Sequence, residues 1–388
     1  MNFHNILIIK QRNIGDVLLV TPVIRELHRV WPDARISVLV NEGTEEMVKH
    51  HPAVEEVIVY PRSRFARLPL LSRLLAEARF LWSLRQQRYD LVVVTTASDR
   101  GIFTARISGA PRRIGYQTGK WLMDALLTDR VAVEQHATHT VYYNLRLLEP
   151  LGVVPYHTRV DLTIPTAAAD MAKEIILLKG LSNFIHVHPT SRWMFKTLKP
   201  ELWGEIIHYL LDKHELAVVL TAADDERELD YIKRVLRCLP EENAQIVNLA
   251  GKLTLLETAA ISRLALGFVG VDTAPMHMAA AVNTPVFAFF GPSGAFHWGP
   301  FASGDKAPPY SKRNGLQQSG PHMIYQQARP CIPCGKDGCD GSKVSQCLHE
   351  ITLADIAAPL DQWLYVQKHP DGAFCALCTP ETSEEETP

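Results

Sequence analysis

A single carboxylate follows the first apolar segment of the chain. Residues 5–10, NILIIK, have the composition of a buried strand, and Asp16 comes shortly after them in IGDVLLVTP. An aspartate at the carboxyl end of a strand lies where open α/β sheets bind ligands, and it can accept a proton from a reacting hydroxyl. It can also cap a helix N-terminus. Thr21 and Pro22 offer a second helix start, with Thr as the cap, so these residues alone leave both roles of Asp16 open.

Hydroxyl and amino groups gather in a second segment, HVHPTSRWMFK, at residues 186–196. Thr190 and Ser191 follow a predicted strand, and Lys196 comes shortly after them. Hydroxyls and backbone N–H groups beyond a strand can surround a phosphate, and a lysine can neutralise its charge. The alternative is a polar surface loop with solvated cations.

A third segment, GVDTAPMHMAAA at residues 270–281, ends an apolar strand and begins a helix that contains a proline. The N-terminus of that helix offers unpaired N–H groups and a positive dipole end to an anion. Asp272 or Thr273 could instead only cap the helix, and a histidine such as His277 is more often packed than bound to a ligand. The chain has neither a G-x-G-x-x-G nor a G-x-x-x-x-G-K-[ST] motif, which argues against a nicotinamide oxidoreductase and a P-loop nucleoside triphosphatase.

Length and composition indicate a soluble protein of two domains. The chain has 388 residues, of which 47% are hydrophobic and 21% charged. No apolar run approaches the roughly 18 to 20 residues that span a membrane, and the N-terminal run ILII is too short for a signal peptide. We therefore expect a cytoplasmic protein. Residues 1–165 carry 21 Lys and Arg against 16 Asp and Glu, so the first half is basic and the second acidic.

Cysteines are confined to the second half of the chain, from Cys238 onward. Four of them lie in CIPCGKDGCDGSKVSQC, namely Cys331, Cys334, Cys339 and Cys347. In a cytosolic chain such spacing favours metal binding over a disulfide framework, and four thiolates can hold a structural zinc ion. Reduced cysteines in a structured loop are the alternative.

Residues 61–88, PRSRFARLPLLSRLLAEARFLWSLRQQR, contain seven arginines and one acid, Glu77. Leu, Phe and Trp recur between the arginines. Such a basic amphipathic stretch suits a membrane surface or an anionic partner. Alternatively, a helix packs its leucines on the core and exposes its arginines to water. No motif of a nucleic-acid-binding module accompanies the basic residues, so we expect no nucleic-acid partner.

Strand-like and helix-like segments alternate along both halves of the chain. Continuously apolar strands in this order predict parallel sheets covered by helices on both faces. Pro165 and the alanines after it mark a boundary. The predicted divisions are a first α/β domain at 1–165, a second at 166–350 with the cysteine-rich loop 331–347, a C-terminal helix at 351–368 interrupted near Pro359, and a disordered acidic tail at 369–388.

Four ordered motifs resemble those of the bacterial lipopolysaccharide heptosyltransferases of glycosyltransferase family 9. They are IGDVLLVTPVIREL, HPTSRWMFKTLKPELW, LAGKLTLLE, and VGVDTAPMHMAAA with TPVFAFFGPSG after it. The similarity covers roughly residues 5–365, and GPSGAFHWGP with the cysteine-rich segment resembles the heptosyltransferase III branch most. The resemblance implies the GT-B fold, in which two Rossmann-like domains with parallel sheets face each other across a cleft. A C-terminal helix often returns to the first domain in this fold.

The resemblance also implies roles for particular residues. Asp16 matches the general base, and Lys196 would stabilise charge on the leaving ADP. The implied donor-binding residues are Thr190, Ser191, Lys196, Gly251, Lys252, Leu253, Asp272, Thr273 and His277. For an acceptor rich in phosphates and carboxylates, the predicted contacts are Arg62, Arg64, Arg67 and Arg73.

The implied reaction is the inverting transfer of L-glycero-D-manno-heptose from ADP-heptose to the inner core of lipopolysaccharide at the inner membrane surface. We expect catalysis to need no cofactor and treat zinc at the four cysteines as purely structural. One alternative is a GT-B transferase that uses another nucleotide-sugar in cell-envelope glycan assembly. The others are a catalytically inactive binding protein of the same fold and a redox- or zinc-regulated partner protein.

Overall fold

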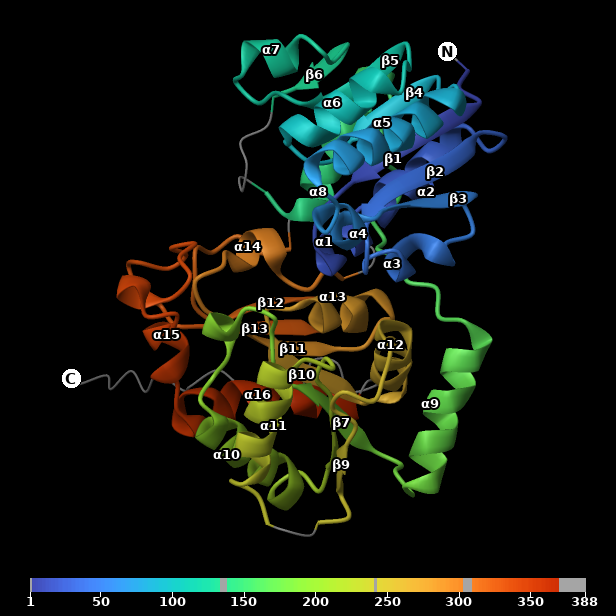
Figure 1. Cartoon of the computed structure of the whole chain (residues 1–388). Coiled ribbons are helices and arrows are strands. Elements are labelled where there is room, and N and C mark those ends of the chain that lie inside the picture. Colours follow the sequence, from blue (N-terminus) through green and yellow to red (C-terminus); the bar gives the residue numbers. More distant parts are fainter. Residues whose placement is uncertain (1, 133–137, 241–242, 303–308, 370–388) are drawn as a thin grey trace, which may run out of the picture.

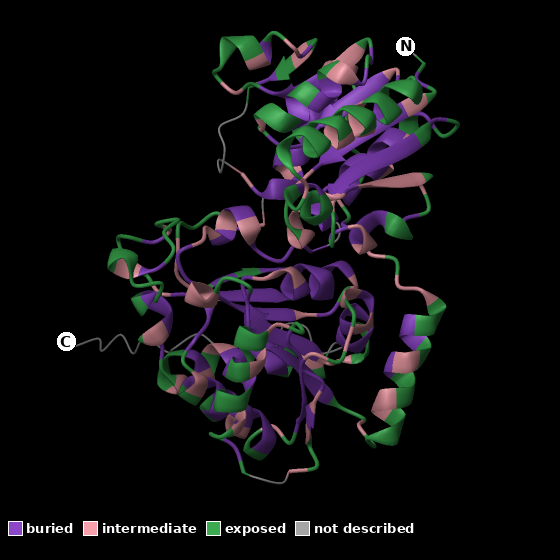
Figure 2. Ribbon diagram, in the orientation of Figure 1, coloured by how far each residue is buried: buried purple, intermediate pink, exposed green. Residues whose placement is uncertain are grey.

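The computed structural model describes residues 2–132, 138–240, 243–302 and 309–369. Two α/β domains lie one above the other, and an extended segment connects the upper domain to α9 (Thr166–Leu178) (Figure 1). Buried residues concentrate in the strands, which helices cover (Figure 2). Within the described ranges, no helix has both the length and the apolar character needed to cross a bilayer. Apart from His369, the predicted acidic tail at 369–388 lies outside the described residues.

The first domain contains a parallel sheet in the order β3-β2-β1-β4-β5-β6. Its strands are β1 (Asn5–Lys10), β2 (Arg35–Asn41), β3 (Glu56–Tyr60), β4 (Leu91–Val94), β5 (Arg112–Tyr116) and β6 (Asp129–Val131). Its helices are α1 (Ile14–Leu18), α2 (Thr21–Val30), α3 (Glu46–Lys49), α4 (Arg62–Ala66), α5 (Leu70–Gln86), α6 (Asp99–Ile107), α7 (Trp121–Asp124), α8 (Thr140–Leu145) and the 3-10 helix η1 (Arg146–Leu151). Apolar runs such as LVVV in β4 are buried, because helices cover both faces of the sheet.

The second domain contains a sheet in the order β12-β13-β11-β10-β7-β8-β9. Its strands are β7 (Phe184–His188), β8 (Ala217–Leu220), β9 (Ile246–Asn248), β10 (Gly267–Val271), β11 (Val286–Phe290), β12 (Gln317–Ser319) and β13 (His322–Gln326). After α9 its helices are η2 (Met194–Lys196), α10 (Pro200–Asp212), α11 (Glu226–Leu236), α12 (Leu255–Leu264), α13 (Ala274–Ala281), α14 (Ala295–Trp298), η3 (Cys339–Gly341), α15 (Gln346–His349) and α16 (Leu353–Lys368). Only the pairing of β12 with β13 is antiparallel among the described strands of this sheet.

Both sheets have the same strand order. The order β3-β2-β1-β4-β5-β6 corresponds to β9-β8-β7-β10-β11-β13, with β12 added at the edge. In such sheets the connections reverse direction between β1 and β4 and between β7 and β10, and ligands bind beyond the carboxyl ends of these strands. Asp16 follows β1, Lys196 follows β7, and Asp272 follows β10. The predicted parallel α/β order is confirmed. It brings these residues to the two switch points, which are the places in each sheet where the direction of the connections reverses.

The C-terminal helix α16 packs on the second domain, so the implied return to the first domain is wrong for the described chain. Trp363 is buried beside Gly267, where any larger residue would collide with the indole, and its ring N–H donates to the carbonyl oxygen of Pro321 at 3.0 Å. Pro359 lies inside the helix without interrupting it. Buried Ile356 and Leu360 pack on the same core on either side of the proline, which favours one continuous helix.

The two domains share an apolar core. One buried cluster combines Leu19 and Val20 of the first domain with Met278 and Phe301 of the second. Polar contacts accompany it, because the Thr140 hydroxyl donates to the carbonyl oxygen of His297 at 3.0 Å. These contacts hold the carboxyl ends of the two sheets toward each other.

Buried histidines predict an acid-sensitive fold. Burial lowers the pKa of His188 to about 3, whereas an unfolded histidine titrates near 6.5. The unfolded chain therefore binds a proton that the folded chain does not, and this histidine's stabilising effect, complete above about pH 6.5, is lost as pH falls toward 3. We expect the free energy of unfolding to fall by up to about 1.4 kcal/mol per pH unit from this histidine. Urea unfolding between pH 7.5 and 5 should show a shallower slope for His188→Gln, and equal slopes would contradict this prediction.

Candidate active site

Asp16 lies in α1, the short helix that contacts α13 of the second domain. The N-cap residue of α1 is Asn13 and that of α2 is Val20, so the capping role considered for Asp16 is wrong. Thr21 begins α2 but does not cap it, because its hydroxyl donates to the carbonyl oxygen of Leu18 at 2.9 Å. The carboxylate of Asp16 is therefore not used to cap either helix.

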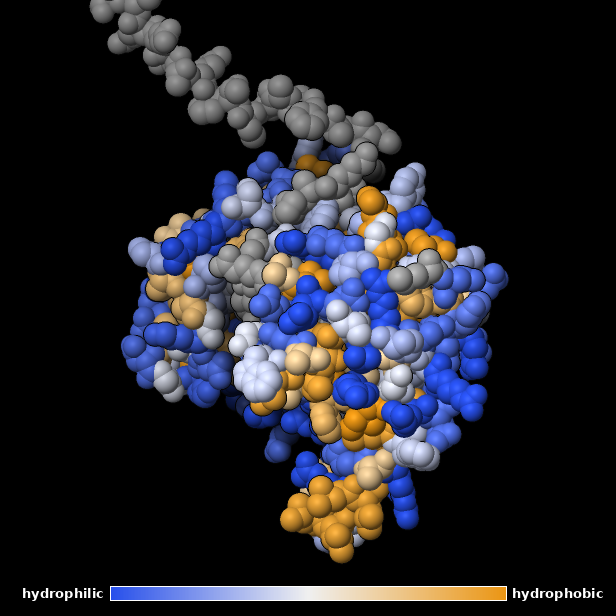
Figure 3. Space-filling model, turned by 90° about the horizontal axis from the view of Figure 1, so that it is seen from above, coloured by the Kyte–Doolittle hydropathy of each residue, from blue (hydrophilic) through white to orange (hydrophobic). Residues whose placement is uncertain are grey.

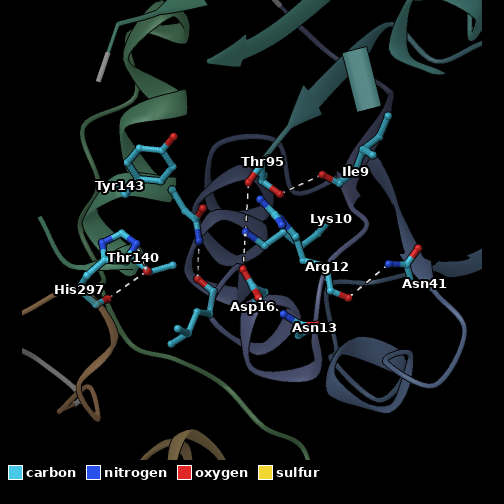
Figure 4. A network of polar contacts seen from close by, with 12 residues as sticks. Ile9, Lys10, Arg12, Asn13, Asp16, Asn41, Thr95, Thr140, Tyr143 and His297 are labelled. Carbon is cyan, nitrogen blue, oxygen red and sulfur yellow. Dashed lines mark hydrogen bonds and ion pairs between the residues drawn. The ribbon is translucent and has the colours of Figure 1, made fainter. Parts of the chain in front are cut away.

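Two neighbouring side chains orient the Asp16 carboxylate (Figure 4). Nζ of Lys10 lies 3.8 Å from Oδ1, and the amide of Asn13 donates to Oδ2 at 3.4 Å. Lys10 is buried and also donates to the carbonyl oxygen of Thr95 at 3.1 Å. Burial lowers the pKa of Lys10, and Asp16 opposes that effect by favouring the charged ammonium. Sequence reasoning missed Lys10, although a lysine that closes an otherwise apolar strand was the available signal.

The two domains approach closely where Gly15 faces His277. A Cβ atom at Gly15 would lie 2.9 Å from Cδ2 of His277, so a larger residue would push α1 and α13 apart. Burial lowers the pKa of His277 to about 4, against the opposing effect of the nearby carboxylates of Asp272 and Asp16. The imidazole is thus neutral at pH 7, and its buried Nδ1 has no hydrogen-bond partner among the described residues. A buried nitrogen without a partner needs an explanation, and a hydrogen bond from His277 to the donor stays a prediction.

Lys196 and Asp272 join the loops that follow β7 and β10. Nζ of Lys196 lies 2.5 Å from Oδ2 of Asp272, which is buried. Burial acts to raise the pKa of Asp272, but Lys196, with smaller effects from Ser293 and His277, brings the pKa below its usual value. Thr273 occupies the N-cap position of α13 without a side-chain capping bond. Side-chain capping by Asp272 or Thr273 is therefore wrong, and Asp272 instead fixes the position of the lysine.

A cavity of about 530 Å³ opens beside Lys196, which is a usual size for a small-molecule site. Its described lining residues all belong to the second domain: Trp193, Phe195, Lys196, Pro292, Ser293, Gly294, Phe296, His297, Trp298, Pro333, Cys334, Gly335, Lys336 and Asp337. Sequence reasoning identified two of them as site residues, Lys196 for the donor and Cys334 as a candidate zinc ligand. The others come from three separate segments, and only the fold brings those segments together.

The hydroxyls predicted to bind the diphosphate have partners within the protein. Thr190 is buried and donates to Oε2 of Glu228 at 2.7 Å, and Oγ of Ser191 accepts from the N–H of Trp193 at 3.3 Å. Glu228 also accepts from the N–H of Ala223 at 3.1 Å. Thr190 therefore ties the loop after β7 to α11, and direct contact of either hydroxyl with a diphosphate stays a prediction.

Gly251, Lys252 and Leu253, which the family resemblance places near the adenosine of the donor, follow β9. Gly251 has a positive φ of 71° and donates its N–H to the carbonyl oxygen of Ala222 at 3.0 Å. Nζ of Lys252 donates to the carbonyl oxygen of Asn248 at 3.0 Å, and Leu253 packs on the domain core. The loop is well anchored but does not line the cavity beside Lys196, so its contact with adenosine stays a prediction.

Comparison with known families decides the class of the protein. Residues 78–317, more than half of the chain, match the family described as glycosyltransferase family 9 (heptosyltransferase). The chain belongs to glycosyltransferase family 9. The resemblance seen in the four sequence motifs is therefore confirmed, and the protein is a glycosyltransferase.

Curated relatives of this family 9 enzyme are lipopolysaccharide heptosyltransferases. The chain is 30% identical over 297 residues to lipopolysaccharide heptosyltransferase 3 of Escherichia coli K12, covering 74% of this chain and 82% of that protein. It is 25% identical over 319 residues to lipooligosaccharide heptosyltransferase 2 of Haemophilus influenzae, covering 78% and 87% of the two chains.

Solved structures of family 9 members share the fold. A glycosyltransferase of this family from Veillonella parvula matches with a TM-score of 0.74 at 18% identity, covering 94% of this chain and 98% of that one. The E. coli ADP-heptose lipopolysaccharide heptosyltransferase II matches with a TM-score of 0.70 at 20% identity, covering 94% and 99%. The predicted GT-B architecture is confirmed.

The arginines predicted to contact the acceptor lie on the first domain of this family 9 enzyme. Arg62 and Arg64 are in α4, Arg67 follows it, and Arg73 is in the first turns of α5. All four are exposed, and α4 lies at the edge of the first domain nearest the second (Figure 1). Acceptor binding by these residues stays a prediction.

The four clustered cysteines are free thiols. Cys331 and Cys334 are exposed and Cys347 is buried. Burial raises the pKa of Cys347 to about 11, and the neighbouring thiols of Cys339, Cys334 and Cys331 add to the effect. Within the part of the chain that the structure describes, no three His, Cys, Asp or Glu side chains are arranged to hold a metal ion. Zinc binding would require the thiols to draw together and stays a prediction.

Proposed function

We propose that this enzyme transfers heptose from ADP-heptose to the inner core of lipopolysaccharide, with inversion at the anomeric carbon. The observation that carries the proposal is the juxtaposition of Asp16 on one domain with His277 and the Lys196–Asp272 pair on the other. A carboxylate and a cation thus lie at facing switch points, which supports roles as the base and as the partner of a diphosphate. The proposal agrees with the relatives' names and with an E. coli heptosyltransferase structure that contains ADP-2-deoxy-2-fluoro heptose.

In the proposed step, the acceptor hydroxyl oxygen bonds to the anomeric carbon while the bond from that carbon to the ADP oxygen breaks. Asp16 takes the hydroxyl proton, and ADP leaves with the bonding electron pair. Lys10 and Asn13 keep the carboxylate oriented. Because attack and departure occur on opposite faces of one carbon, a single displacement inverts its configuration.

The donor half of the proposed site is preorganised before chemistry. Asp272 holds Lys196 in place, and Lys196 together with the N-terminal N–H groups of α13 would stabilise the negative charge that builds up on the diphosphate. The neutral His277 can share a hydrogen bond with the substrate without adding a second positive charge beside the base.

We also propose that the exposed arginines Arg62, Arg64, Arg67 and Arg73 bind phosphates and carboxylates of the acceptor. Lipopolysaccharide is anchored in a bilayer, so the proposed site of action is the cytoplasmic surface of the inner membrane. No nucleic-acid partner forms part of the proposal.

The proposed chemistry uses no metal ion or other cofactor, because Lys196 and a helix N-terminus can stabilise the leaving group. Transfer should persist after chelation of divalent ions, and recovery of activity only on addition of a metal would reject metal-independent chemistry.

Structural zinc at Cys331, Cys334, Cys339 and Cys347 is a separate proposal. Elemental analysis of protein purified under reducing conditions should find one zinc per chain, and its absence would reject the structural site.

Transfer assays with a panel of nucleotide-sugars test the proposed function. Purified enzyme is incubated with ADP-heptose, other ADP-sugars or UDP-sugars, and lipopolysaccharide acceptors truncated at defined inner-core positions. We expect product only with ADP-heptose and with an acceptor that carries inner-core sugars. Transfer from another donor would favour the rival GT-B transferase, and no transfer or donor hydrolysis from any of them would favour an inactive binding protein.

A further inference from the structure

Helix α5 is apolar on two faces. Its inner face packs Phe80, Leu81 and Leu84 against the core of the first domain. Its first turns are different, because Leu70 and Leu74 are 74% and 58% exposed. The alternative in which the leucines of this basic segment pack on the core is therefore wrong for the first half of the helix.

The outer face of α5 forms an apolar stripe. Positions 71, 75, 78 and 82 recur every three or four residues, so they lie on one side of the helix. Leu71, Leu75 and Trp82 at three of these positions are 72%, 54% and 61% exposed, and Ala78 between them is also exposed. Figure 2 draws α5 largely as exposed on the side away from the sheet. A contiguous exposed apolar surface of this kind marks a site of interaction with a protein or a membrane.

Further apolar side chains lie in the same helical layer. Helices α5, α6 and α7 pack on the same core cluster, so their outer surfaces all face away from the same side of the sheet. Phe103 of α6 is 50% exposed, and Trp121 and Leu122 of α7 are 76% and 57% exposed. Seen from above the first domain, apolar side chains form a projecting cluster at the front edge, on the side where α4 and α5 lie in Figure 1 (Figure 3).

Positive charge surrounds this apolar surface. Among the described residues, Arg62, Arg64, Arg67 and Arg79 make no ion pair within 4.0 Å. Glu77, the single acid of residues 61–88, is shared by Arg73 and Arg100. A surface of leucine and tryptophan with unpaired arginines is complementary to a bilayer that contains anionic lipid, because the apolar groups enter the acyl boundary and the arginines meet the head groups. A protein partner would need a matching acidic surface.

We infer that the exposed apolar surface of α5, made of Leu71, Leu75 and Trp82 on its outer face together with Leu70 and Leu74 of its first turns, docks on the surface of an anionic phospholipid bilayer, with α7 as a second contact. The inference rests on the proposed function, since it supplies the means by which the enzyme meets a lipid-anchored acceptor. The arginines of α4 directly precede this face in the chain and lie at the edge nearest the second domain. A docked enzyme would therefore present them to the sugar of a lipid in the same bilayer.

Vesicle flotation of the full chain tests the inference. The wild-type protein is mixed with phosphatidylcholine vesicles that contain either no phosphatidylglycerol or about 30% of it, at low and at high salt. We expect binding to the anionic vesicles that falls at least about tenfold in the triple variant Leu71→Ser, Leu75→Ser, Trp82→Ser. The matched control is Leu177→Ser, Leu178→Ser on α9, which removes leucines that are 81% and 75% exposed away from the arginines. The control should bind as the wild type does.

Charge is tested separately by Arg79→Gln with Arg88→Gln, which should weaken binding to anionic vesicles and reduce its dependence on salt. Far-ultraviolet circular dichroism verifies that each variant is folded. Binding that is equal for neutral and anionic vesicles, or unchanged in the triple variant, would overturn the inference. So would light scattering that shows a wild-type dimer and a monomeric triple variant, because the face would then serve self-association.

The readout separates this inference from the proposed function. Vesicle binding needs no donor or acceptor, so it stays measurable even when heptose transfer fails. With an acceptor freed of its acyl chains, the triple variant should retain wild-type turnover, because its substitutions lie on the outer face. With acceptor embedded in anionic vesicles, its turnover should fall in proportion to binding, and undiminished turnover there would overturn the inference.

Discussion

Asp16→Asn is expected to lower the turnover of heptose transfer about 10³-fold while leaving the affinity for ADP-heptose within about twofold of the wild type. Asparagine keeps the size of the side chain and its contact with Asn13, but it cannot take a proton from the acceptor hydroxyl. Turnover is measured by the release of ADP, and donor affinity by calorimetry on the same preparations.

The matched control is Asp33→Asn, an exposed aspartate in the same domain, which should leave both quantities unchanged. Thermal unfolding checks that the loss of the carboxylate beside the buried Lys10 has not unfolded the variant. Unchanged turnover would reject Asp16 as the base. Loss of donor binding without a selective effect on turnover would assign it to the donor site instead.

Lys196→Met is expected to weaken ADP-heptose binding by at least about 100-fold and to destabilise the fold by about 2 kcal/mol. The donor loses the cation that faces its diphosphate, and Asp272 stays buried without its partner. Breaking a fully buried pair costs about 3 to 5 kcal/mol, and the smaller value applies here because the Lys196 side chain is 21% exposed. Donor affinity is measured by calorimetry, and stability by urea unfolding.

The double variant Lys196→Met, Asp272→Asn separates the two effects. Neutralising Asp272 removes the unpaired buried charge, so stability should return toward that of the wild type while donor affinity stays low. Lys199→Met, an exposed lysine in the same segment, serves as the matched control and should change neither. Wild-type donor affinity in the double variant would contradict the role of Lys196.

Much of the fold could be predicted, because its determinants are local in the chain. Continuous apolar runs such as LVVV and NILIIK form buried parallel strands, and helices separate them in the expected order. The position of α16 could not be predicted from the same pattern. Its docking depends on a fit between Trp363 and Gly267, which are distant in the sequence.

The candidate site was accessible from the sequence only in part. Asp16, Lys196 and Asp272 stand at strand ends, and strand ends meet at one edge of a parallel sheet. The sequence marks Lys10 only as a lysine that closes an apolar strand, and its contact with Asp16 depends on the fold. The family resemblance implied His277, but its burial against Gly15 depends on packing between the domains.

The exposed stripe on α5 was ambiguous in the sequence for a different reason. Its leucines occupy both faces of the helix, so periodicity could not show which of them face the sheet. Only the packing of α5 on the first domain decides between a buried and an exposed leucine.

The anomeric configuration of the transferred sugar tests the central claim most directly. The product of wild-type enzyme, ADP-heptose and truncated lipopolysaccharide is isolated, and the one-bond carbon–proton coupling at the new anomeric centre is measured by nuclear magnetic resonance. Direct displacement with Asp16 as the base predicts a heptose whose configuration is inverted relative to the donor. A heptose transferred with retained configuration would contradict this mechanism.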